Sequence, residues 1–506
     1  MNSDKLSDPR TRRDFIRQVS CAAVGTAALT NTIRDLRLIN SALAVQPVPT
    51  GYKALVCIFL AGGNDANNWI VPTDTTTYAQ YSAIRGNLAL PLSSLLTLRT
   101  GPLGTDPAYT DADTHTYGFH PACPELRTLF GEDKLAAVFN VGTLVRPTTR
   151  AQYVANTKFY TPPQLFSHSD QVTQWQTSVP DAPPTTGWGG RVSDLLDPLA
   201  NPSGSISMSV SLNGANTFEI GNLVSQYQVS TTGAVVLSGD TLMSATGART
   251  RALKNILALN DPNLQRTAYA DVLENSIAVG ALLNTKILTT ALATDSPPGT
   301  WVWNTPFPNT TLGNQLKMVA RLIQARGPTA FNMNRQIFFC GVGGYDTHTS
   351  QVSVNGTDQP TNVNGAHYKL LAEVSTCMLA FQRAMEQLNA VTVANPLSLP
   401  LNSVTAFTAS DFSRTLPTNS QGSDHGWGSH HIVVGGAVNG GQTYGKLPTF
   451  AVNGPDDTGL GRWIPTLAVD QHSATLAKWF GVDPSEMAAL FPNLSRFPSS
   501  DIGFMI

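Results

Sequence analysis

Apolar residues in this chain come in short runs that alternate with amphipathic stretches. Residues 52–60 (YKALVCIFL) are almost continuously apolar, which is typical of a buried parallel strand that helices cover on both faces. The pattern predicts further strands at residues 135–141, 335–340, 403–408 and 432–438, and helices at residues 121–130, 170–177, 368–388 and 471–480. Strands that alternate with helices in this way predict an α/β fold with a mostly parallel central sheet.

The alternation is interrupted between about residues 188 and 303. Short strand-like runs at residues 203–210 and 233–238 are followed by amphipathic helical segments within residues 252–292. We interpret approximately residues 190–303 as an inserted cap region of one α/β domain that spans residues 45–506.

The first residues have the features of an export signal. Residues 11–17 (TRRDFIR) resemble the twin-arginine motif, and residues 19–29 form an apolar, alanine-rich run. Residues 42–44 (ALA) then supply a cleavage site. We therefore predict a Tat signal peptide at residues 1–44, passage through the Tat translocon, and a periplasmic or secreted protein. The apolar run is shorter than the roughly 20 residues of a membrane span, so no stable span is expected.

Composition excludes some functions. Only 13 % of the residues are charged and the formal net charge is -2, which gives no electrostatic signature of nucleic-acid binding. No GxGxxG motif follows a predicted strand, which disfavours a nicotinamide enzyme. Of the five cysteines, Cys57 and Cys340 lie in apolar strand-like runs, where buried thiols are common. The pattern leaves open one or two disulfides.

Aspartate and histidine side chains follow several of the predicted strands. In open α/β sheets, ligands bind beyond the carboxyl ends of the strands, so these positions are expected to share one rim. The candidates are Asp65, then Asp346 and His348, then Asp411, and then the stretch DHGWGSHH at residues 424–431. Carboxylate and imidazole ligands together suit a divalent metal such as Zn, Mn or Fe, with one or two ions per chain. Any one of these histidines could instead be a hydrogen-bonded structural residue.

The same motifs resemble those of a large bacterial family of Tat-exported proteins, labelled "domain of unknown function 1501" (DUF1501). The motifs that carry the resemblance span almost the whole chain: FLAGGND (residues 59–65), FHP (119–121), VGTL (141–144), FSHSDQ (166–171), GWGGR (187–191), GYDTH (344–348), TASDF (408–412) and DHGWGSHH (424–431).

This family in turn is similar to the alkaline phosphatase and sulfatase superfamily. The resemblance implies a three-layer α/β/α sandwich and a metal site with ligands in a fixed order along the chain. The matching positions are Asp65, then a serine nucleophile at Ser167 or Ser169, then Asp346 and His348, then Asp411, and then His425 or His430. Phe412 stands where the superfamily has a histidine after the aspartate, and the spacing from Asp346 to His348 is tighter than usual. Both departures argue against a full two-metal centre and leave two alternatives, a site with one metal or a ligand set completed by His430 or His431.

The remaining candidates have structural alternatives. Ser169, with Ser167 as its neighbour, is the candidate nucleophile, because a hydroxyl near a helix N-terminus lies close to N–H groups that can bind an anion. Ser169 could instead serve as the helix N-cap. His120 is a candidate catalytic residue. His168, Arg414 and Arg191 are candidate substrate-binding residues, and a structural histidine or a salt bridge is the alternative for each.

The sequence therefore predicts an exported metal-dependent hydrolase of phosphate or sulfate esters that acts on a small-molecule or glycan substrate. The alternative is a non-catalytic exported protein that keeps the fold and binds a sugar, a lipid or an assembly partner. A sulfatase proper is disfavoured, because the chain has no Cys-x-Pro-x-Arg motif.

Overall fold

The computed structural model describes residues 47–99, 107–155, 159–183, 185–234, 248–259, 264–283, 304–327, 330–352, 361–390 and 399–506. Pro49–Ile506 form one compact unit. The predicted signal peptide, residues 1–44, lies outside the described residues.

The described elements of this unit alternate between strands and helices. The strands are β1 (Lys53–Leu60), β2 (Ile70–Pro72), β3 (Leu96–Thr97), β4 (Tyr117–Phe119), β5 (Leu135–Gly142), β6 (Ser209–Ser211), β7 (Tyr227–Ser230), β8 (Gly233–Ala234), β9 (Arg335–Val342), β10 (Val404–Ser410), β11 (Ser429–Gly435), β12 (Gln442–Tyr444) and β13 (Leu467–Ala468). The helices are α2 (Thr75–Arg85), α3 (Pro124–Gly131), α4 (Arg150–Val154), α5 (His168–Thr177), α6 (Trp188–Ala200), α7 (Ala248–Leu257), α8 (Leu264–Leu283), α10 (Thr311–Gln324), α11 (Ala366–Asn389), α12 (Val469–Phe480) and α13 (Met487–Leu490).

The main sheet has the strand order β12-β5-β11-β10-β1-β9-β6-β7-β8, and β13 pairs with β5. β1 lies in its middle and pairs in parallel with β9 on one side and β10 on the other. This central place explains its continuous apolar sequence, because both faces and both edges of the strand are covered. Most pairs are parallel, and β11 runs antiparallel to both β10 and β5. The structure is thus an α/β protein with a largely parallel central sheet.

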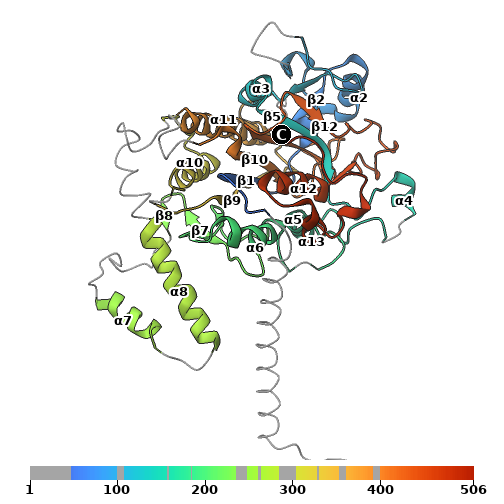
Figure 1. Cartoon of the computed structure of the whole chain (residues 1–506). Helices are drawn as coiled ribbons and strands as arrows, with labels where there is room; N and C mark the ends of the chain where they lie inside the picture. Colours follow the sequence, from blue (N-terminus) through green and yellow to red (C-terminus); the bar gives the residue numbers. More distant parts are fainter. Residues whose placement is uncertain are drawn as a thin grey trace, which may run out of the picture. The chain divides into compact units, whose positions relative to one another are not determined.

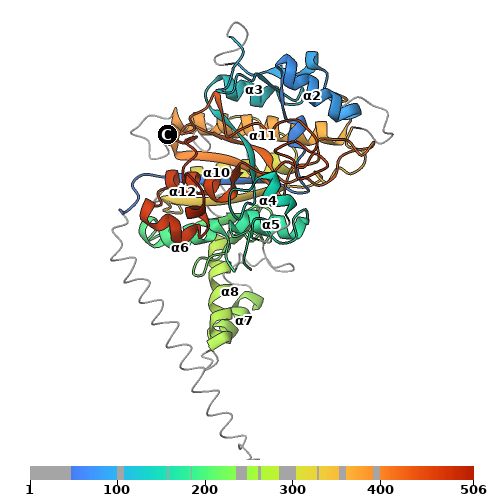
Figure 2. The same cartoon turned by 90° about the vertical axis from the view of Figure 1, so that its right-hand side faces the viewer.

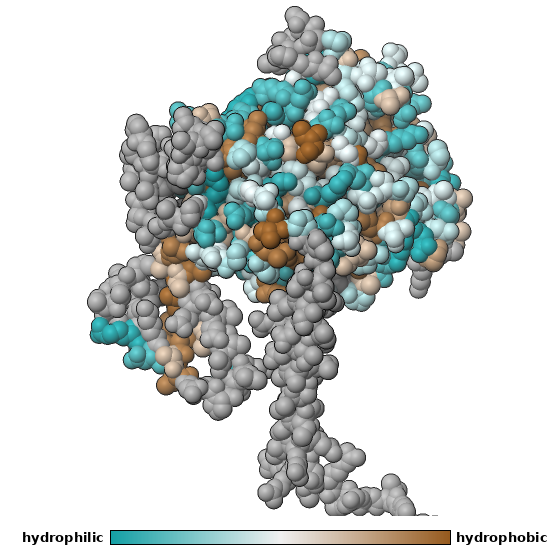
Figure 3. All heavy atoms as spheres, viewed as in Figure 1, coloured by the Kyte–Doolittle hydropathy of each residue, from teal (hydrophilic) through white to brown (hydrophobic). Residues whose placement is uncertain are grey.

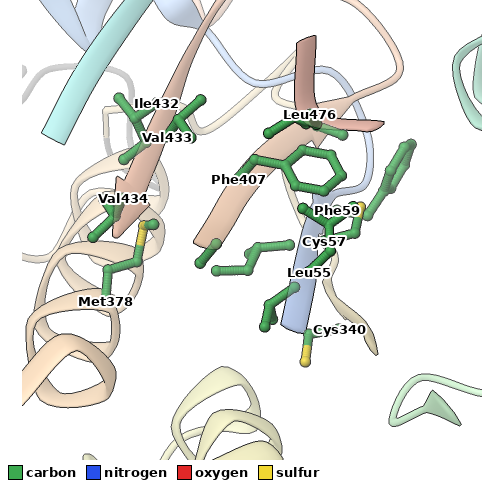
Figure 4. Packing of buried hydrophobic residues seen from close by; sticks show 14 of the residues in the cluster. Leu55, Cys57, Phe59, Cys340, Met378, Phe407, Ile432, Val433, Val434 and Leu476 are labelled. Carbon is green, nitrogen blue, oxygen red and sulfur yellow. The ribbon is translucent and has the colours of Figure 1, made fainter. Parts of the chain in front are cut away.

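Helices lie on both faces of this sheet (Figure 1). α3, α10 and α11 pack on one face, and α5, α6 and α12 pack on the other. The core between the layers is apolar. Figure 4 shows Met378 of α11 beside Val434 of β11, and Leu476 of α12 beside Phe407 of β10. Phe407 is fully buried, and burial of such a side chain contributes about 1.5–3 kcal/mol to stability.

The segment expected to form an inserted cap contributes strands to the main sheet. β6 pairs in parallel with β9, and β7 and β8 extend the sheet beyond β6. α7 and α8 follow in the same segment, and residues 235–247 and 284–303 of the expected cap lie outside the described chain.

A small antiparallel sheet of β2, β4 and β3 accompanies the main one. Polar and apolar side chains are interspersed over the viewed face of the described chain (Figure 3). None of the described helices has both the length and the apolar character that crossing a bilayer would require. Cys57, Cys123, Cys340 and Cys377 are free and buried, so the disulfides left open by the sequence do not form among the described cysteines.

Candidate metal centre at the edge of the sheet

The direction of the strands brings the polar loops together. Because β1, β9 and β10 are parallel, their carboxyl ends lie at the same edge of the sheet. β11 runs the opposite way, so the loop that precedes it also reaches this edge. α5 begins nearby, because Nδ1 of its first residue, His168, lies 2.7 Å from Oδ2 of Asp411, directly after β10. Figure 2 shows α4 and α5 next to each other. Residues from four separate parts of the chain meet here.

Three histidines surround one carboxylate at this edge. Nε2 of His348 lies 3.3 Å from Oδ1 of Asp346, and Nε2 of His425 lies 3.4 Å from the same oxygen. Nε2 of His168 lies 3.6 Å from Oδ2 of Asp346. We call His168, Asp346, His348 and His425 the His–Asp group.

The spacing within the His–Asp group matches that of metal ligands. Ligand atoms that lie about 2.0–2.1 Å from a tetrahedral zinc ion are roughly 3.3 Å from one another. The distances from Asp346 to the three imidazoles are close to this value. Suitable ligand atoms of His168, Asp346 and His425 all lie within 4.8 Å of one another. These three residues therefore fit a single divalent cation with nitrogen and oxygen ligands, and His348 lies beside them.

Each histidine is oriented through its other ring nitrogen. Nδ1 of His168 lies 2.7 Å from Oδ2 of Asp411, and Nδ1 of His348 lies 3.0 Å from Oδ1 of Asp424. Nδ1 of His425 lies 2.8 Å from the carbonyl oxygen of Phe166. A carbonyl can only accept, so Nδ1 of His425 carries the hydrogen and Nε2 keeps its lone pair. Carboxylates and carbonyls behind histidine ligands are a regular feature of metal sites.

The two closest imidazoles need a positive charge between them. Nε2 of His348 and Nε2 of His425 are 2.9 Å apart. In each neutral ring the single N–H is at Nδ1, where it donates to Asp424 or to the Phe166 carbonyl, so neither Nε2 has a hydrogen to donate. Two lone pairs at that distance repel each other unless a proton or a metal cation lies between them. Burial lowers the pKa of His425, the hydrogen bond to Phe166 raises it, and the charge of Arg414 lowers it further. The net effect favours the neutral imidazole that binds metals.

Arg414 holds the carboxylate of Asp346 in place. Its Nη1 donates to Oδ1 of Asp346 at 2.8 Å and to the carbonyl of Gly62 at 3.3 Å, and its Nη2 donates to the carbonyl of Ser423. Burial raises the pKa of Asp346, but the hydrogen bond and charge of Arg414 outweigh it and leave this pKa below its usual value. Arg414, a candidate substrate-binding residue from the sequence, thus supports the His–Asp group and keeps its aspartate ionised.

Asp65 lies in a different environment from the one expected. It is fully buried, and its Oδ2 is paired with the Arg85 guanidinium and accepts a hydrogen bond from the side chain of Gln351. Arg85 also donates to the carbonyls of Thr415 and Leu416, both at 2.7 Å. The structure therefore places Asp65 in a buried ion pair and not in the His–Asp group.

His430 is also separate from the His–Asp group. It lies within β11, and its Nδ1 accepts a hydrogen bond from the backbone N–H of Asn140 at 3.2 Å. Its ring packs on Phe139, and burial lowers its pKa to about 3. The sequence predicts a strand at residues 432–438, but β11 spans Ser429–Gly435 and so includes His430 and His431.

The two candidate nucleophiles share one carboxylate. Ser167 is the N-cap of α5, so the expectation that Ser169 caps this helix was wrong. The Ser167 hydroxyl donates to Oδ2 of Asp170 at 2.6 Å, and Oγ of Ser169 lies 3.2 Å from the same oxygen. Both serines flank His168 in sequence, and their printed side-chain contacts are with each other and with Asp170.

His120 and Arg191 have structural contacts. Nδ1 of His120 accepts a hydrogen bond from the backbone of Ala122 at 3.0 Å, and the buried ring packs against His367 and Tyr368. Arg191 donates to the carbonyls of Leu490, Thr186 and Thr177 and so ties α6 to neighbouring loops. These contacts account for both side chains without a substrate.

Sequence reasoning missed part of the site. The sequence shows Asp424 within a motif but indicates no role for it, and it predicts a substrate-binding role for His168. Because Asp424 is next to His425 in the sequence, it could have been predicted to contribute to the same site. The contact with the Phe166 carbonyl could not be predicted from the sequence, because every residue has a backbone carbonyl.

The fold and the His–Asp group define an α/β protein with a largely parallel sheet and a metal-type ligand set at its strand ends. Residues 310–489 match the model of a family described as "Protein of unknown function (DUF1501)", which supports the DUF1501 family for this chain. The matched stretch includes Asp346, Arg414 and His425, whereas His168 precedes it. A search of curated proteins found no match.

Proposed function

We propose that this protein is a metal-dependent hydrolase of phosphate or sulfate esters, with one divalent cation held by the His–Asp group. The observation that supports the proposal is the convergence of three Nε2 atoms on the Asp346 carboxylate, with each Nδ1 bound to a carboxylate or carbonyl. Mixed nitrogen and oxygen ligands suit Zn, Mn or Fe.

A bound divalent cation would polarise an ester oxygen and favour attack by a hydroxyl or by water. The protein's own groups supply the rest of the chemistry. Arg414 orients the Asp346 carboxylate, and Asp411 and Asp424 orient His168 and His348. Ser167 is the better nucleophile candidate, because its hydroxyl already donates to Asp170, which is placed to take the proton.

The fold is consistent with the proposal at a coarser level. A largely parallel sheet with helices on both faces and polar residues at the carboxyl ends of its strands is the arrangement expected of an alkaline-phosphatase-like sandwich. The proposed Tat signal at residues 1–44 would place the enzyme in the periplasm or outside the cell. Fold alone supports a function only by analogy.

A second candidate is a non-catalytic metal-binding or assembly protein, and Phe412 is the observation that favours it. Its ring centroid lies 4.7 Å from that of His168 and 4.6 Å from that of His425. An aromatic ring therefore covers one side of the His–Asp group, where the superfamily has a further ligand. This arrangement favours one metal over two.

Metal content of the folded protein tests the proposal. We expect about one equivalent of a transition metal in protein purified after native export, and its loss in Asp346→Ala and His348→Ala. Asp424→Asn should keep the ligands but weaken affinity about 10- to 100-fold, because it removes only the orienting carboxylate. The exposed Asp113→Asn is the control and should bind as the wild type does.

The outcomes separate the two candidates. Metal together with turnover of aryl phosphate or aryl sulfate esters would support the hydrolase. Metal without turnover would favour the non-catalytic protein. Folded protein with no metal would overturn the metal centre itself.

A further inference from the structure

Two buried histidines lie close together between the main sheet and the helices on one of its faces. His431 belongs to β11 and His472 to α12, and their ring centroids are 6.3 Å apart. Both side chains are almost completely buried, and none of their four ring nitrogens has a hydrogen-bond partner in the described part of the chain. A neutral imidazole carries one donor and one acceptor, so this pair, which we call the buried histidine pair, is unusual.

Aromatic rings surround the buried histidine pair. The ring centroid of Trp175, in α5, lies 5.1 Å from that of His431 and 5.7 Å from that of His472. Phe407 of β10 and Phe504 near the C-terminus lie 5.8 Å and 5.3 Å from His472, again between ring centroids. None of these aromatic side chains has an oxygen that could accept a hydrogen bond from a charged imidazole.

The titratable groups nearest the pair offer it no negative charge in acid. His430 precedes His431 in β11 and is itself buried and neutral. Asp470, two positions before His472, is fully buried, and burial raises its pKa to about 8, although a backbone hydrogen bond and the charge of Arg191 lower it in part. β10 and β5, the two strands beside β11, contain no titratable residue. Other charged residues around the pair lie in the first turn of α5, beside Asp470 or in an exposed ion pair: His168 and Asp170, then Asp181, Arg191 and Arg496, then Lys478 and Asp501.

Burial keeps both imidazoles of the pair neutral. It lowers the pKa of His472 from 6.5 to about 3, and it lowers the pKa of His431 well below 6.5, with His472 and His430 lowering it further. In the unfolded chain both rings take up a proton below about pH 6.5. The contribution of the pair to stability is therefore fully present above about pH 6.5 and is lost as the pH falls towards the folded-state pKa values.

The pair also packs on a helix that contributes to the His–Asp group. Trp175, which contacts both imidazoles, is in the same helix as His168, the first residue of α5. About two turns of helix separate Trp175 from His168. His168 in turn lies against Asp346 and Asp411. A displacement of α5 from the sheet would therefore move His168 away from both carboxylates.

We propose that the buried histidine pair is an acid-sensitive switch, so that α5 and α12 pack on the sheet at neutral pH and separate from it in acid. A protonated ring needs water or a carboxylate as a hydrogen-bond partner, and it reaches water only when these helices move off the sheet. The separation of the helices does not rest on the proposed hydrolase function, whereas its effect on the metal site does.

Hydrogen exchange of the folded protein at pH 7 and pH 4.5, followed by mass spectrometry and corrected for the intrinsic effect of pH, measures this opening. We expect the opening equilibrium of amides in α5 and α12 to rise about tenfold or more at pH 4.5. Amides of α10, on the other face of the sheet, should keep their protection. Asp470 holds a proton in the folded state and so opposes the opening, which makes the net rise smaller than the two histidines alone would give.

Substitutions assign the rise to the pair. His472→Leu removes one of the two groups that take up protons and should abolish the rise. His115→Leu makes the same change at a partly exposed histidine that is paired with Asp74, and it should keep the rise. His431→Leu keeps the test valid if His472→Leu fails to fold, because it removes the other imidazole of the pair.

Three results would overturn the proposal. One is equal protection of α5 and α12 at both pH values in the wild type. Another is a rise that persists unchanged in His472→Leu, because it would come from other groups such as His168. The third is an equal loss of protection in α10, which would show global unfolding and not the separation of two helices.

The rate of zinc release to a chelator tests the link to the His–Asp group. We expect the increase in this rate between pH 7 and pH 5.5 to be about tenfold smaller in His472→Leu than in the wild type. Equal increases would exclude an effect of the switch on the metal site. Protein that takes up no zinc but shows the expected exchange pattern would refute the metal centre and leave the switch standing.

Discussion

At the scale of single residues, contacts decide what each histidine can do. His425 and His430 are five positions apart, yet His425 belongs to the His–Asp group and His430 is buried within β11. The outer nitrogen of His425 is bound to a carbonyl, which fixes the tautomer needed for a metal ligand. His430 lies against Phe139, and its low pKa follows from burial alone.

A buried glutamate away from the site is expected to make stability depend on pH. Burial raises the pKa of Glu219 to about 8 from 4.5, although hydrogen bonds from Asn216 and the backbone of Val210 lower it in part. Between these values the folded state holds a proton that the unfolded chain has lost, so the free energy of unfolding falls as pH rises. Glu219→Gln should remove this fall and gain about 1–3 kcal/mol over the wild type between pH 5 and pH 8.

Urea unfolding at a series of pH values measures this difference. Glu486→Gln, a substitution at a partly exposed glutamate, is the control and should keep the pH dependence of the wild type. Parallel stability curves for Glu219→Gln and the wild type would contradict the prediction.

At the scale of elements, the turn after β1 joins three of the loops at the sheet edge. Gly62 has a φ of 116°, and its N–H donates to Oδ1 of Asp411 at 3.0 Å. A Cβ at Gly62 would lie 2.4 Å from the backbone nitrogen of Asp346. The glycine therefore allows the β1 turn to pack directly against the loop that carries the Asp346 carboxylate.

Gly62→Ala should disturb the His–Asp group. The added methyl group must push the Asp346 loop away, so we expect a loss of about 2–4 kcal/mol in stability and weaker metal binding. Gly51→Ala is the matched control, since Gly51 also has a positive φ of 67° but open space around its Cβ. It should cost about 1–2 kcal/mol from backbone strain alone. Chemical denaturation and metal titration of both variants measure the effects, and equal metal affinities would argue against the packing role.

At the scale of the whole molecule, buried charges tie distant segments together. The Asp65–Arg85 pair links the turn after β1 to the end of α2, and it reaches Gln351 and the carbonyls of Thr415 and Leu416. Both partners are fully buried, so neither can be solvated when the other is removed. This pair supports the loops behind the His–Asp group.

Asp65→Asn distinguishes this structural role from the ligand role that the sequence suggested. We expect a loss of about 3–5 kcal/mol in stability, with unchanged metal stoichiometry in the folded fraction. Asp501→Asn breaks the exposed pair with Lys478 and should cost at most about 1 kcal/mol. If Asp65→Asn kept the stability of the wild type but bound no metal, Asp65 would have to be a metal ligand.

The sequence by itself determined the elements whose patterns are local. Residues 52–60 predicted β1 to within one residue, and the predicted helix at 368–388 matches α11 (Ala366–Asn389), because apolar periodicity depends only on neighbours along the chain. It also placed Asp346, His348 and Asp411 in the loops after strands, since Asp411 directly follows one apolar run and the other two lie in the loop after another. Parallel strands then bring these ends to one edge.

Tertiary structure decided the rest, because it depends on pairing between distant segments. β11 runs antiparallel to β10 and begins at Ser429, so His430 lies within the strand and His425 lies in the loop before it. The apolar pattern of this strand predicts neither its direction nor its first residue. Asp65 is paired with Arg85 and therefore lies outside the His–Asp group. The Phe166 backbone carbonyl orients His425, and a backbone contact of this kind cannot be predicted from the side chains in the sequence. Sequence determines which groups are present, whereas burial and partners in the folded chain determine which of them can meet and bind a metal ion.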